Sequence, residues 1–563
     1  MKQNEIKSNI EKNKVDKKKA WMKILLLGAL GAGIFLRLYS LGKFSLWYDE
    51  LITAQWGYID LSTFAYNAGC SQIKTMLSYL RIDQQPPLYY LLIYLWSIVF
   101  GETAYALRIF SVIMNILAGI VFFKFARLFV EKNTTICAVL LFVFSPMQMW
   151  YAQEARTYSL SVFLGILMMY FYIRALRENK PLMWKRYLFT GILSIYSNYF
   201  LIFLILSFAV PLLLKENRRY FKKWLLYTIV IFLFFMPYLY IFVTQFKSII
   251  GFSWIASPGP KSILITLTNF VIGYNNNPVQ YFIFAPFLIS LFLYGLFKFG
   301  RNKSAILTLS TFLFFPLVAS YLFSKLITNI YLDRAFLPFS FLFYLFVANG
   351  VMNIDKKVFR IPICLFLVFG ISAGSVNYYK GYFPGDRDQE IYHMGVHKKR
   401  DYSKALRFIA ENISSGDVLA CADMQANLII GVHFRPYKYP SKITRHIRVF
   451  IPKYNKMPLW IVRRLNHLKN GEWLPISDYE DKETLHFVEF RKVKVGEVKE
   501  GRFRRIWLIS SFWDDGWGIE ADASAAREYL KEKYKVICSL HRENMFIELY
   551  EFIETGEKKA SEK

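Results

Sequence analysis

Apolar runs long enough to cross a lipid bilayer are concentrated in one part of this chain, residues 22–378. Runs of roughly 20 predominantly apolar residues qualify as transmembrane helices, because a shorter helix does not reach across the hydrocarbon core. Hydrophobic residues make up 55% of the chain, little above the average of soluble proteins, so their clustering is more informative than their total. After residue 378 charged residues return and the apolar runs shorten. The sequence therefore predicts an α-helical polytopic membrane protein followed by a soluble domain.

We expect about eleven membrane spans in this region, because the runs are close to the length that a spanning helix needs. The stretch 187–214 is too long for one helix and too short for two ordinary ones. Ser197 and Asn198 interrupt it, so we predict two short helices that meet at a polar turn. The first run is long and lacks a small-residue cleavage motif, which predicts a retained helix rather than a signal peptide. The other runs lie near residues 22–42, 105–127, 134–151, 157–175, 224–243, 281–299, 304–324, 335–352 and 359–377.

The basic residues between these runs fall on one side of the membrane if the spans alternate. Because Lys and Arg are enriched in cytoplasmic loops, we predict a multi-pass protein of the plasma (inner) membrane with its N-terminus in the cytoplasm. The net charge of +29 largely follows these loops, so it indicates membrane topology rather than nucleic-acid binding. The basic segments lie at residues 2–23, 124–132, 174–186, 215–223, 298–303 and 356–360.

The apolar segment 86–100 does not fit this alternation. If it crossed the membrane, every later basic loop would lie outside. As a helix its 15 residues reach only about 22 Å, short of the roughly 30 Å hydrocarbon core. We therefore predict an interfacial or re-entrant helix with both ends at the outer face.

Residues 379–563 are numerous enough for one further domain, which the topology places outside the membrane. The pattern over 401–423 predicts a helix, a turn and a buried strand. The segments RRIWLISS, AAREYLKEKYKVICSL and FIELYEF predict a strand, then a helix with a strand, then a last strand. We therefore predict a cytoplasmic segment at 1–21, a transmembrane domain at 22–378 and an extracytoplasmic α/β domain at 379–563.

Asp49 and Glu50 lie side by side in LWYDELITAQ, directly after the first apolar run. Charge beside a bilayer is costly unless it faces water or a partner, so such acids are functional-site candidates. Trp47 and Tyr48 are interfacial aromatics that would hold the two carboxylates at the membrane surface. A carboxylate held there can accept a proton from a hydroxyl presented from the aqueous side. The alternative is a solvated loop that carries two acids.

Further polar residues gather on the predicted outer face, and we expect them to contribute to a substrate site. Each of these residues alone also has a purely structural explanation. Arg108 is then an arginine whose guanidinium reaches the membrane interface, and the charges at Glu154–Arg156 and Asp333–Arg334 are local ion pairs. Guanidinium groups bind phosphate and carboxylates accept protons, so the set suits a phosphate-bearing lipid and a hydroxyl acceptor. The candidates are Gln85, Arg108, Gln153, Glu154, Arg156, Tyr158, Asp333 and Arg334.

With these motifs the sequence resembles the GT-C membrane glycosyltransferases that use polyprenyl-phosphate sugars. It is similar in particular to the protein O-mannosyltransferase-like family and the related aminoarabinose transferases, over roughly residues 22–352. The resemblance implies that Asp49 is the catalytic base with Glu50 beside it, that Arg108 is functional and that polyprenyl phosphate is the leaving group. The matching segments are LWYDE, QQPPLYYLL, FGETAYALRIFS, SPMQMWYAQEARTYSL and DRAFLP.

The histidines constrain the chemistry further. All seven lie at His393 or later in the chain. A histidine base or a histidine-built zinc site beside Asp49 is therefore excluded. Binding of a divalent metal by Asp49 and Glu50 alone stays open, whereas the resemblance implies a mechanism with no metal or other cofactor.

Together these features predict an inverting glycosyltransferase of the cell envelope. Its partners would be a polyprenyl-phosphate sugar donor, membrane lipids and a glycan, lipid or protein acceptor, with no role for nucleic acid. One alternative is a polysaccharide polymerase or ligase, which would carry its essential groups in a large late outer loop. Another is a flippase of lipid-linked sugars, which would need polar groups at the bilayer midplane, and no internal repeat of the transporter kind is visible.

Overall fold

The structure is a computed structural model, and the chain forms two compact units in it. The first comprises Met1–Leu41, Asp60–Leu92 and Arg108–Lys398, and the second Gly42–Ile59, Ile93–Leu107 and Lys399–Lys563. The second unit thus combines the C-terminal part with two earlier segments, one of which carries Asp49 and Glu50. The residues described are 20–21, 23–57, 84–101, 103–251, 255–274, 278–300, 302–380, 402–413, 418–421, 429, 487–489, 505–511, 527–528, 530–531, 534–542 and 545–552.

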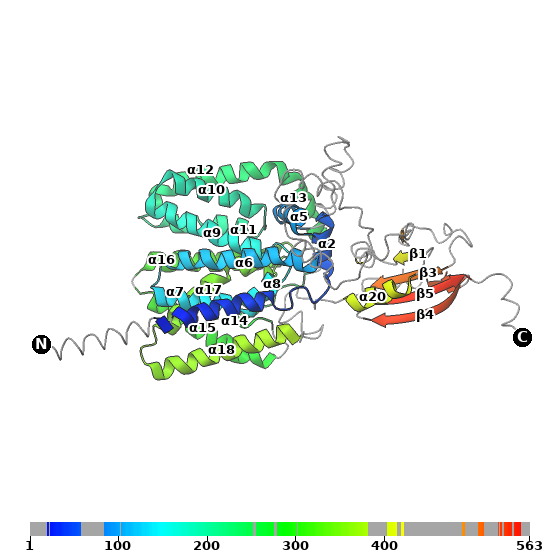
Figure 1. Cartoon of the computed structure of the whole chain (residues 1–563). Coiled ribbons are helices and arrows are strands. Elements are labelled where there is room, and N and C mark those ends of the chain that lie inside the picture. Colours follow the sequence, from blue (N-terminus) through cyan, green and yellow to red (C-terminus); the bar gives the residue numbers. More distant parts are fainter. Residues whose placement is uncertain are drawn as a thin grey trace, which may run out of the picture. The chain divides into compact units, whose positions relative to one another are not determined.

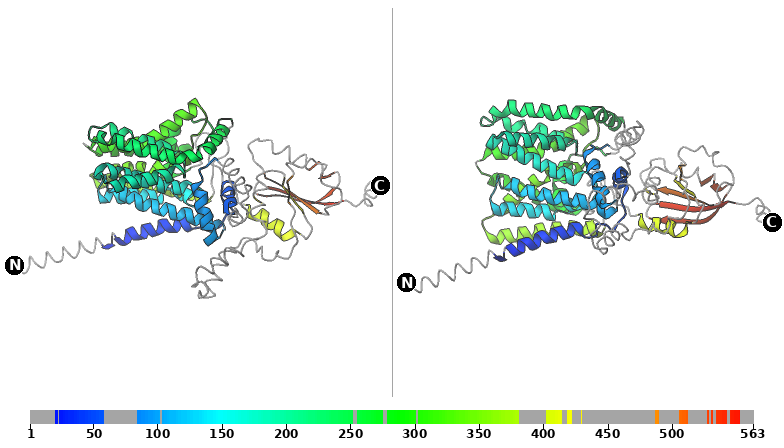
Figure 2. Two further views of the ribbon diagram at one scale, coloured as in Figure 1. Left: turned by 90° about the horizontal axis from the view of Figure 1, so that it is seen from above. Right: turned by 45° about the horizontal axis from the view of Figure 1, so that its top comes forward.

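The first unit is a bundle in which long helices run side by side (Figure 1; Figure 2). Helices are expected for membrane segments, because a spanning segment must satisfy its own backbone hydrogen bonds. The bundle opens with a helix over residues 23–38. The later helices are α5 (Leu88–Phe100), α6 (Ala104–Ala126), α7 (Lys132–Phe144), α8 (Pro146–Ala152), α9 (Tyr158–Glu178), α10 (Pro181–Ile195), α11 (Leu201–Ser207), α12 (Phe221–Phe235), α13 (Leu239–Gly251), α14 (Ser262–Ile272), α15 (Pro278–Lys298), α16 (Lys303–Leu326), α17 (Leu337–Met352) and α18 (Lys357–Lys380), with short 3₁₀ turns η1 (Val210–Leu213), η2 (Arg218–Tyr220), η3 (Met236–Tyr238) and η4 (Asp333–Phe336).

Among the described residues, 7 helical segments are long and apolar enough to cross a membrane, or 8 if a bent pair is one span. The pair corresponds to the predicted span 134–151, and the seven segments correspond to 105–127, 157–175, 224–243, 281–299, 304–324, 335–352 and 359–377. These helices confirm the predicted class, an α-helical polytopic membrane protein. The larger count of about eleven stays a prediction, because residues 23–38, α10 and α11 are shorter than this criterion requires.

Polar residues interrupt the predicted span 134–151 and separate the two short helices predicted in 187–214. α7 and α8 meet with a bend of 56°. Ser145 caps α8 by accepting the backbone N–H of Gln148, and Pro146 occupies the first helical turn, where its missing N–H costs nothing. Between α10 and α11, the side chain of Asn198 accepts the backbone N–H of Phe200. The predicted break at Ser197 and Asn198 is therefore confirmed.

α5 corresponds to the predicted interfacial segment 86–100. It is 13 residues long, so it extends only about 20 Å and is not among the helices long enough to span a membrane. Its length agrees with the prediction, whereas the side of the membrane on which its ends lie stays a prediction.

α17 is the centre of the bundle, and all its residues from Leu337 to Val351 are buried. It packs against α7, α9, α15 and α16. Glycines let α15 and α17 cross closely: a Cβ at Gly295 would lie 1.9 Å from the carbonyl oxygen of Phe346. Asn349 adds a hydrogen bond of 2.8 Å to the Gly295 carbonyl. Small residues and polar side chains at a helix crossing are the usual means of helix association in lipid.

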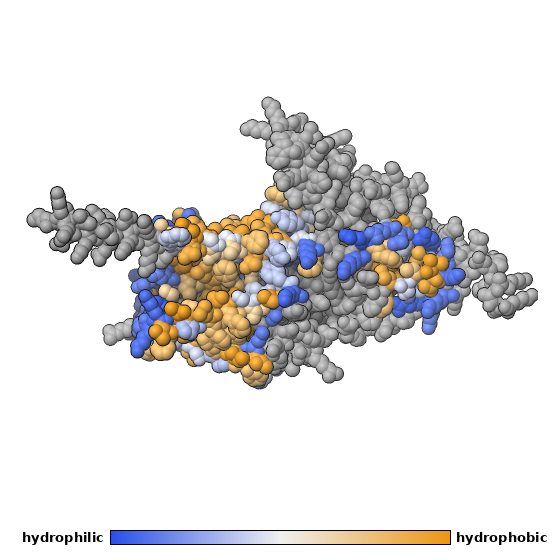
Figure 3. Space-filling model, turned by 60° about the horizontal axis from the view of Figure 1, so that its bottom comes forward, coloured by the Kyte–Doolittle hydropathy of each residue, from blue (hydrophilic) through white to orange (hydrophobic). Residues whose placement is uncertain are grey.

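Large apolar side chains also cover the outside of the bundle. On the face in Figure 3, hydrophobic residues form a broad area over the first unit, and hydrophilic residues edge it on the left. Leu326 is 80% exposed and Phe297 77%. Such a surface fits lipid, because large contiguous apolar areas are rare on soluble proteins.

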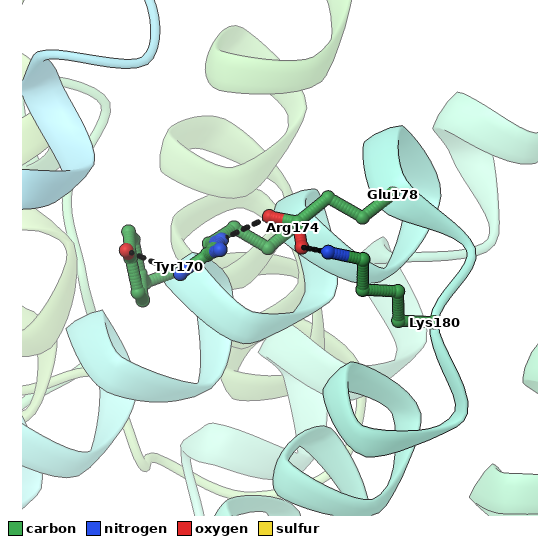
Figure 4. Close-up of polar contacts among 4 residues, drawn as sticks. All are labelled: Tyr170, Arg174, Glu178 and Lys180. Atoms are coloured by element: carbon green, nitrogen blue, oxygen red, sulfur yellow. Dashed lines mark hydrogen bonds and ion pairs between the residues drawn. The ribbon is translucent and has the colours of Figure 1, made fainter.

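The end of α9 carries a cluster of charged side chains, drawn in Figure 4. Arg174 forms an ion pair with Glu178 and donates to the Tyr170 hydroxyl at 3.1 Å, and Lys180 lies 3.8 Å from Glu178. Asn179 then ends the helix in the left-handed conformation. The sequence predicts this basic turn on the cytoplasmic side, and that side stays a prediction.

The second unit contains α2 (Tyr48–Gly57), the part of α5 from Ile93 onward, the start of α6 up to Leu107, α20 (Ser403–Asn412) and a five-stranded sheet. The strand order is β2-β1-β3-β5-β4, with β1 parallel to β2 and β3 and with β5 antiparallel to β3 and β4. A helix precedes β1, as predicted for 401–423. The predicted α/β character of the C-terminal part is thus seen in the described residues. The strands are β1 (Val418–Cys421), β2 (Phe487–Glu489), β3 (Arg505–Ser511), β4 (Tyr534–Arg542) and β5 (Met545–Phe552).

Candidate functional site

Asp49 and Glu50 lie in the first turn of α2, where carboxylates are favoured by the helix dipole. Glu50 is fully buried, and its Oε2 accepts the backbone N–H of Trp47 at 3.3 Å. A glutamate at the third helical position that reaches back to the cap residue is half of a capping box. Asp49 is half-buried, and its carbonyl accepts the Thr53 hydroxyl at 3.5 Å. The two acids therefore differ: one carboxylate oxygen of Glu50 helps to start the helix.

The other predicted residues lie in the first unit, and four of them surround a pair of tyrosines. The hydroxyls of Tyr151 and Tyr274 are 2.8 Å apart. Glu154, Tyr158 and Arg334 interact electrostatically with Tyr151, and Asp333 and Arg334 do so with Tyr274. These two tyrosines were not among the predicted site residues, although Tyr151 lies in the WYAQEARTY motif. We refer to Tyr151, Glu154, Tyr158, Tyr274, Asp333 and Arg334 as the tyrosine cluster.

The tyrosine cluster is aromatic and buried. The rings of Tyr151 and Tyr158 meet edge to face at 4.8 Å between their centres. The guanidinium carbon of Arg334 lies 5.7 Å from the centre of the Tyr158 ring, a cation–π arrangement. Burial raises the pKa of Tyr274 well above its ordinary value, so this phenol keeps its proton and can donate a hydrogen bond.

Asp333 is fully buried, and donors on α14 bind both of its carboxylate oxygens. Its Oδ1 accepts the hydroxyl of Thr266 at 2.5 Å, and its Oδ2 accepts the amide of Asn269 at 2.6 Å. The Tyr281 hydroxyl in turn donates to the Asn269 side-chain oxygen at 2.7 Å. Asp333 therefore fastens η4 to α14, and through η4 it fixes the backbone of Arg334.

Arg156 and Glu154 are buried in the turn between α8 and α9. Arg156 donates to the Tyr90 hydroxyl on α5 at 2.9 Å. Its backbone N–H donates to the carbonyl of Glu154 at 2.8 Å. These hydrogen bonds stabilise the turn and link it to α5.

Gln153 caps the end of the first helix. Its side-chain amide donates to the carbonyls of Leu36, Arg37 and Tyr39 at 2.9–3.0 Å, and its oxygen accepts the Tyr378 hydroxyl. The last carbonyls of a helix have no partner inside the helix, so an amide placed there stabilises the end. These contacts give Gln153 a structural role, and a role in substrate binding stays a prediction.

The two remaining candidates lie near α5 and α6. Arg108 is 3% exposed and donates to the carbonyl of Leu41 at 2.8 Å. Gln85 is half-buried and precedes the buried Pro86 and Pro87 that lead into α5. The contact to Leu41 ties α6 to the end of the first helix.

The structure adds a buried arginine that the sequence analysis did not single out, Arg37. Its Nη1 donates to the carbonyls of Gly33 at 3.0 Å and Val143 at 2.7 Å, and its Nε donates to Asn115 at 2.9 Å. Asn115 donates to Gln148, which donates to Ser340 on α17. An arginine within a predicted membrane span was the signal that could have identified it.

Within the residues that the structure describes, no group of three or more His, Cys, Asp and Glu side chains could hold a metal ion. Contacts of the two acids include the hydrogen bond from the Trp47 N–H to Glu50 and that from the Thr53 hydroxyl to the Asp49 carbonyl. The option of a metal held by these two acids alone stays open.

Residues 84–241 match the family described as dolichyl-phosphate-mannose-protein mannosyltransferase. This match includes Gln85, Arg108 and the 153–158 turn but neither the acidic pair nor Asp333 and Arg334. No protein with a curated function matches the sequence.

Solved structures with a similar fold span nearly the whole chain. ArnT from Cupriavidus metallidurans in the apo state superimposes with a TM-score of 0.53 and 10% identity, covering 95% of this chain and 98% of that one. The same protein bound to undecaprenyl phosphate gives a TM-score of 0.52 and 10% identity, covering 94% and 98%. At this identity the likeness concerns the fold. With the family match, it confirms the resemblance to GT-C membrane glycosyltransferases and the prediction of an enzyme of that type.

Proposed function

We propose that this chain transfers a sugar from a polyprenyl-phosphate donor to an acceptor hydroxyl at the outer face of the membrane, with inversion at the anomeric carbon. The family match supports glycosyl transfer from a lipid phosphate. ArnT, which has a similar fold, binds undecaprenyl phosphate, and this supports a donor of the same chemical class. The observation that carries the mechanism is the different environment of the two neighbouring acids on α2.

Asp49 is the proposed general base. Glu50 is fully buried and has one carboxylate oxygen on the Trp47 N–H, whereas Asp49 is half-buried. Asp49 takes the proton of the acceptor hydroxyl, and the oxygen attacks the anomeric carbon. The bond from that carbon to the phosphate oxygen breaks, and polyprenyl phosphate leaves with the electron pair. General-base catalysis of this kind contributes typically about 10²–10⁴-fold.

Arg334 is the proposed group that binds the donor phosphate. Negative charge grows on the phosphate oxygen as the sugar departs, so a guanidinium aimed at that oxygen binds the transition state more tightly than the ground state. The hydrogen bonds from Thr266 and Asn269 to Asp333 support this assignment, since they hold η4 against α14 and thereby fix the backbone of Arg334. Arg108, which donates to the Leu41 carbonyl, is the second candidate for binding the donor phosphate.

The membrane arrangement belongs to the same proposal. Residues 1–21 lie in the cytoplasm, residues 22–378 form the catalytic domain with about eleven spans, and residues 379–563 lie outside. The acidic pair and the polar residues of the site then share the outer face, where a lipid-linked sugar and a water-borne acceptor can meet.

The test is a turnover assay with the purified full-length protein in proteoliposomes and a polyprenyl-phosphate sugar. We expect release of polyprenyl phosphate, and a loss of about 10²–10⁴-fold in Asp49→Asn with the fold retained. Asp355→Asn, which removes an exposed carboxylate, is the matched control. Movement of the donor across the bilayer without release of polyprenyl phosphate would identify a flippase. More than a third of wild-type turnover in Asp49→Asn would refute its role as the base.

A further inference from the structure

We propose that the C-terminal part of the chain positions the acidic helix α2, through a hydrogen bond between Ser45 and Tyr402. The backbone N–H of Tyr402 donates to the Ser45 hydroxyl at 2.7 Å, across 357 residues of sequence. Ser45 is 2% exposed and Tyr402 1% exposed. Both residues belong to the second unit, which combines residues 42–59 with residues 399–563. The inference rests on the proposed role of Asp49.

The backbone N–H of Tyr402 needs a hydrogen-bond acceptor. Tyr402 is the cap residue of α20, and the first N–H groups of a helix have no acceptor inside it. A buried donor left without an acceptor is destabilising, because it has lost its hydrogen bond to water and gained none in the protein. Ser45 supplies that acceptor, so the start of α20 and the segment before α2 stabilise each other.

α20 is itself fixed to the sheet. Ala405, Leu406 and Ile409 are buried on one of its faces. The ring of Phe408 lies 6.1 Å from that of Trp507 on β3, and Arg505 on β3 donates to the Asn412 carbonyl at 3.2 Å. A path of contacts therefore leads from the sheet through α20 to Ser45.

Ser45 lies close enough to α2 to set the entry of that helix. Leu46 and Trp47 follow it and are 3% and 7% exposed. Trp47 is the cap residue whose N–H is bound by Glu50. Asp49 is therefore four residues beyond an anchored point. Because misplacing a catalytic group by about 1 Å can cost roughly 10²-fold, the anchor should affect kcat more than KM.

The experiment uses the full-length protein in detergent and compares Ser45→Ala with Ser45→Thr, which keeps the hydroxyl. Hydrogen exchange of peptides covering residues 43–51 and 402–409 reports on the anchor independently of activity. In Ser45→Ala we expect exchange of these peptides to rise about 5- to 10-fold, as loss of one hydrogen bond implies, and kcat to fall at nearly unchanged KM. Ser45→Thr should restore both. Ser97→Ala is the control, since that buried hydroxyl donates within its own helix.

A second pair of variants isolates the donor. Tyr402→Ala keeps the backbone N–H and Tyr402→Pro removes it, so the difference between them measures the bond to Ser45. Equal exchange in these two variants, together with unchanged exchange in Ser45→Ala, would overturn the inference. Faster exchange with unchanged kcat, while Asp49→Asn is inactive, would also overturn it. If Asp49→Asn is instead active, the proposed role of Asp49 fails, and the exchange data still decide whether the anchor exists.

Discussion

The guanidinium carbon of Arg334 lies 5.7 Å from the centre of the Tyr158 ring, which brings the start of η4 to the first residue of α9. A cation over an aromatic face is stabilised by about 0.5–2 kcal/mol, depending on how far it is desolvated. This contact holds a positive charge among buried tyrosines. It is the arrangement on which the proposed binding of the donor phosphate depends.

Arg334→Gln should lower turnover by about 10²–10³-fold, the usual cost of removing one donor that stabilises transition-state charge. Arg334→Lys should recover part of the activity, because it keeps the charge and loses the forked geometry. Turnover and thermal stability are measured for each variant. Arg127→Gln, at an exposed arginine that donates to the Val130 carbonyl, is the control. Loss of stability with normal turnover per folded molecule would assign Arg334 a structural role.

Glu50→Gln should keep most of the activity, because glutamine retains an oxygen that can accept the Trp47 N–H. Glu50→Ala removes that acceptor and should destabilise the protein by about 1 kcal/mol, as loss of a helix cap does. Unfolding and turnover of both variants are compared with those of Asp49→Asn. A Glu50→Gln protein that folds and is as inactive as Asp49→Asn would show that the charge of Glu50 takes part in the reaction.

Asp333→Asn should lower stability by about 1–3 kcal/mol, because the new amide faces the Asn269 amide donor at the centre of a buried network. The expected signature is a lower unfolding temperature in detergent, with turnover changed only as far as Arg334 is displaced. Asp355→Asn again serves as the control. An unchanged unfolding temperature would show that the hydrogen bonds between Asp333 and α14 do not stabilise the fold.

Arg37→Gln should destabilise the bundle by about 2 kcal/mol. A hydrogen bond between membrane helices contributes about 0.6 kcal/mol on average, and Arg37 makes several, including those to Val143 and Asn115. Thermal unfolding of Arg37→Gln is compared with that of Arg127→Gln. Equal unfolding temperatures for the two variants would contradict a structural role for the Arg37 network.

The predicted topology can be tested with single cysteines in a variant whose five native cysteines are replaced with serine. An impermeant thiol reagent added to intact cells should label Glu102→Cys and leave Glu216→Cys unlabelled. Residue 102 lies outside the described residues, and Glu216 is exposed before η2. Labelling of residue 216 but not 102 would show that α5 crosses the membrane.

The sequence alone determined the features that depend on short stretches of chain. Apolar runs of the right length specified most of the spans, because a helix in lipid must be long enough and apolar enough to cross. Ser197 and Asn198 marked the break between α10 and α11, since polar residues interrupt such a run. The ordered motifs predicted the type of enzyme, because the residues of each motif are adjacent in the chain.

Only the tertiary structure decided which polar side chains meet. Gln153 caps a helix 117 residues earlier, Arg37 binds the Val143 carbonyl 106 residues later, and Asp333 binds Thr266 across 67 residues. No local pattern specifies such partners, because a buried polar group accepts any donor or acceptor that the packing of distant helices brings within about 3 Å. The sequence therefore identified candidate polar residues, and the fold showed which of them hold helices together and which gather around Tyr151 and Tyr274, with Asp333 belonging to both groups.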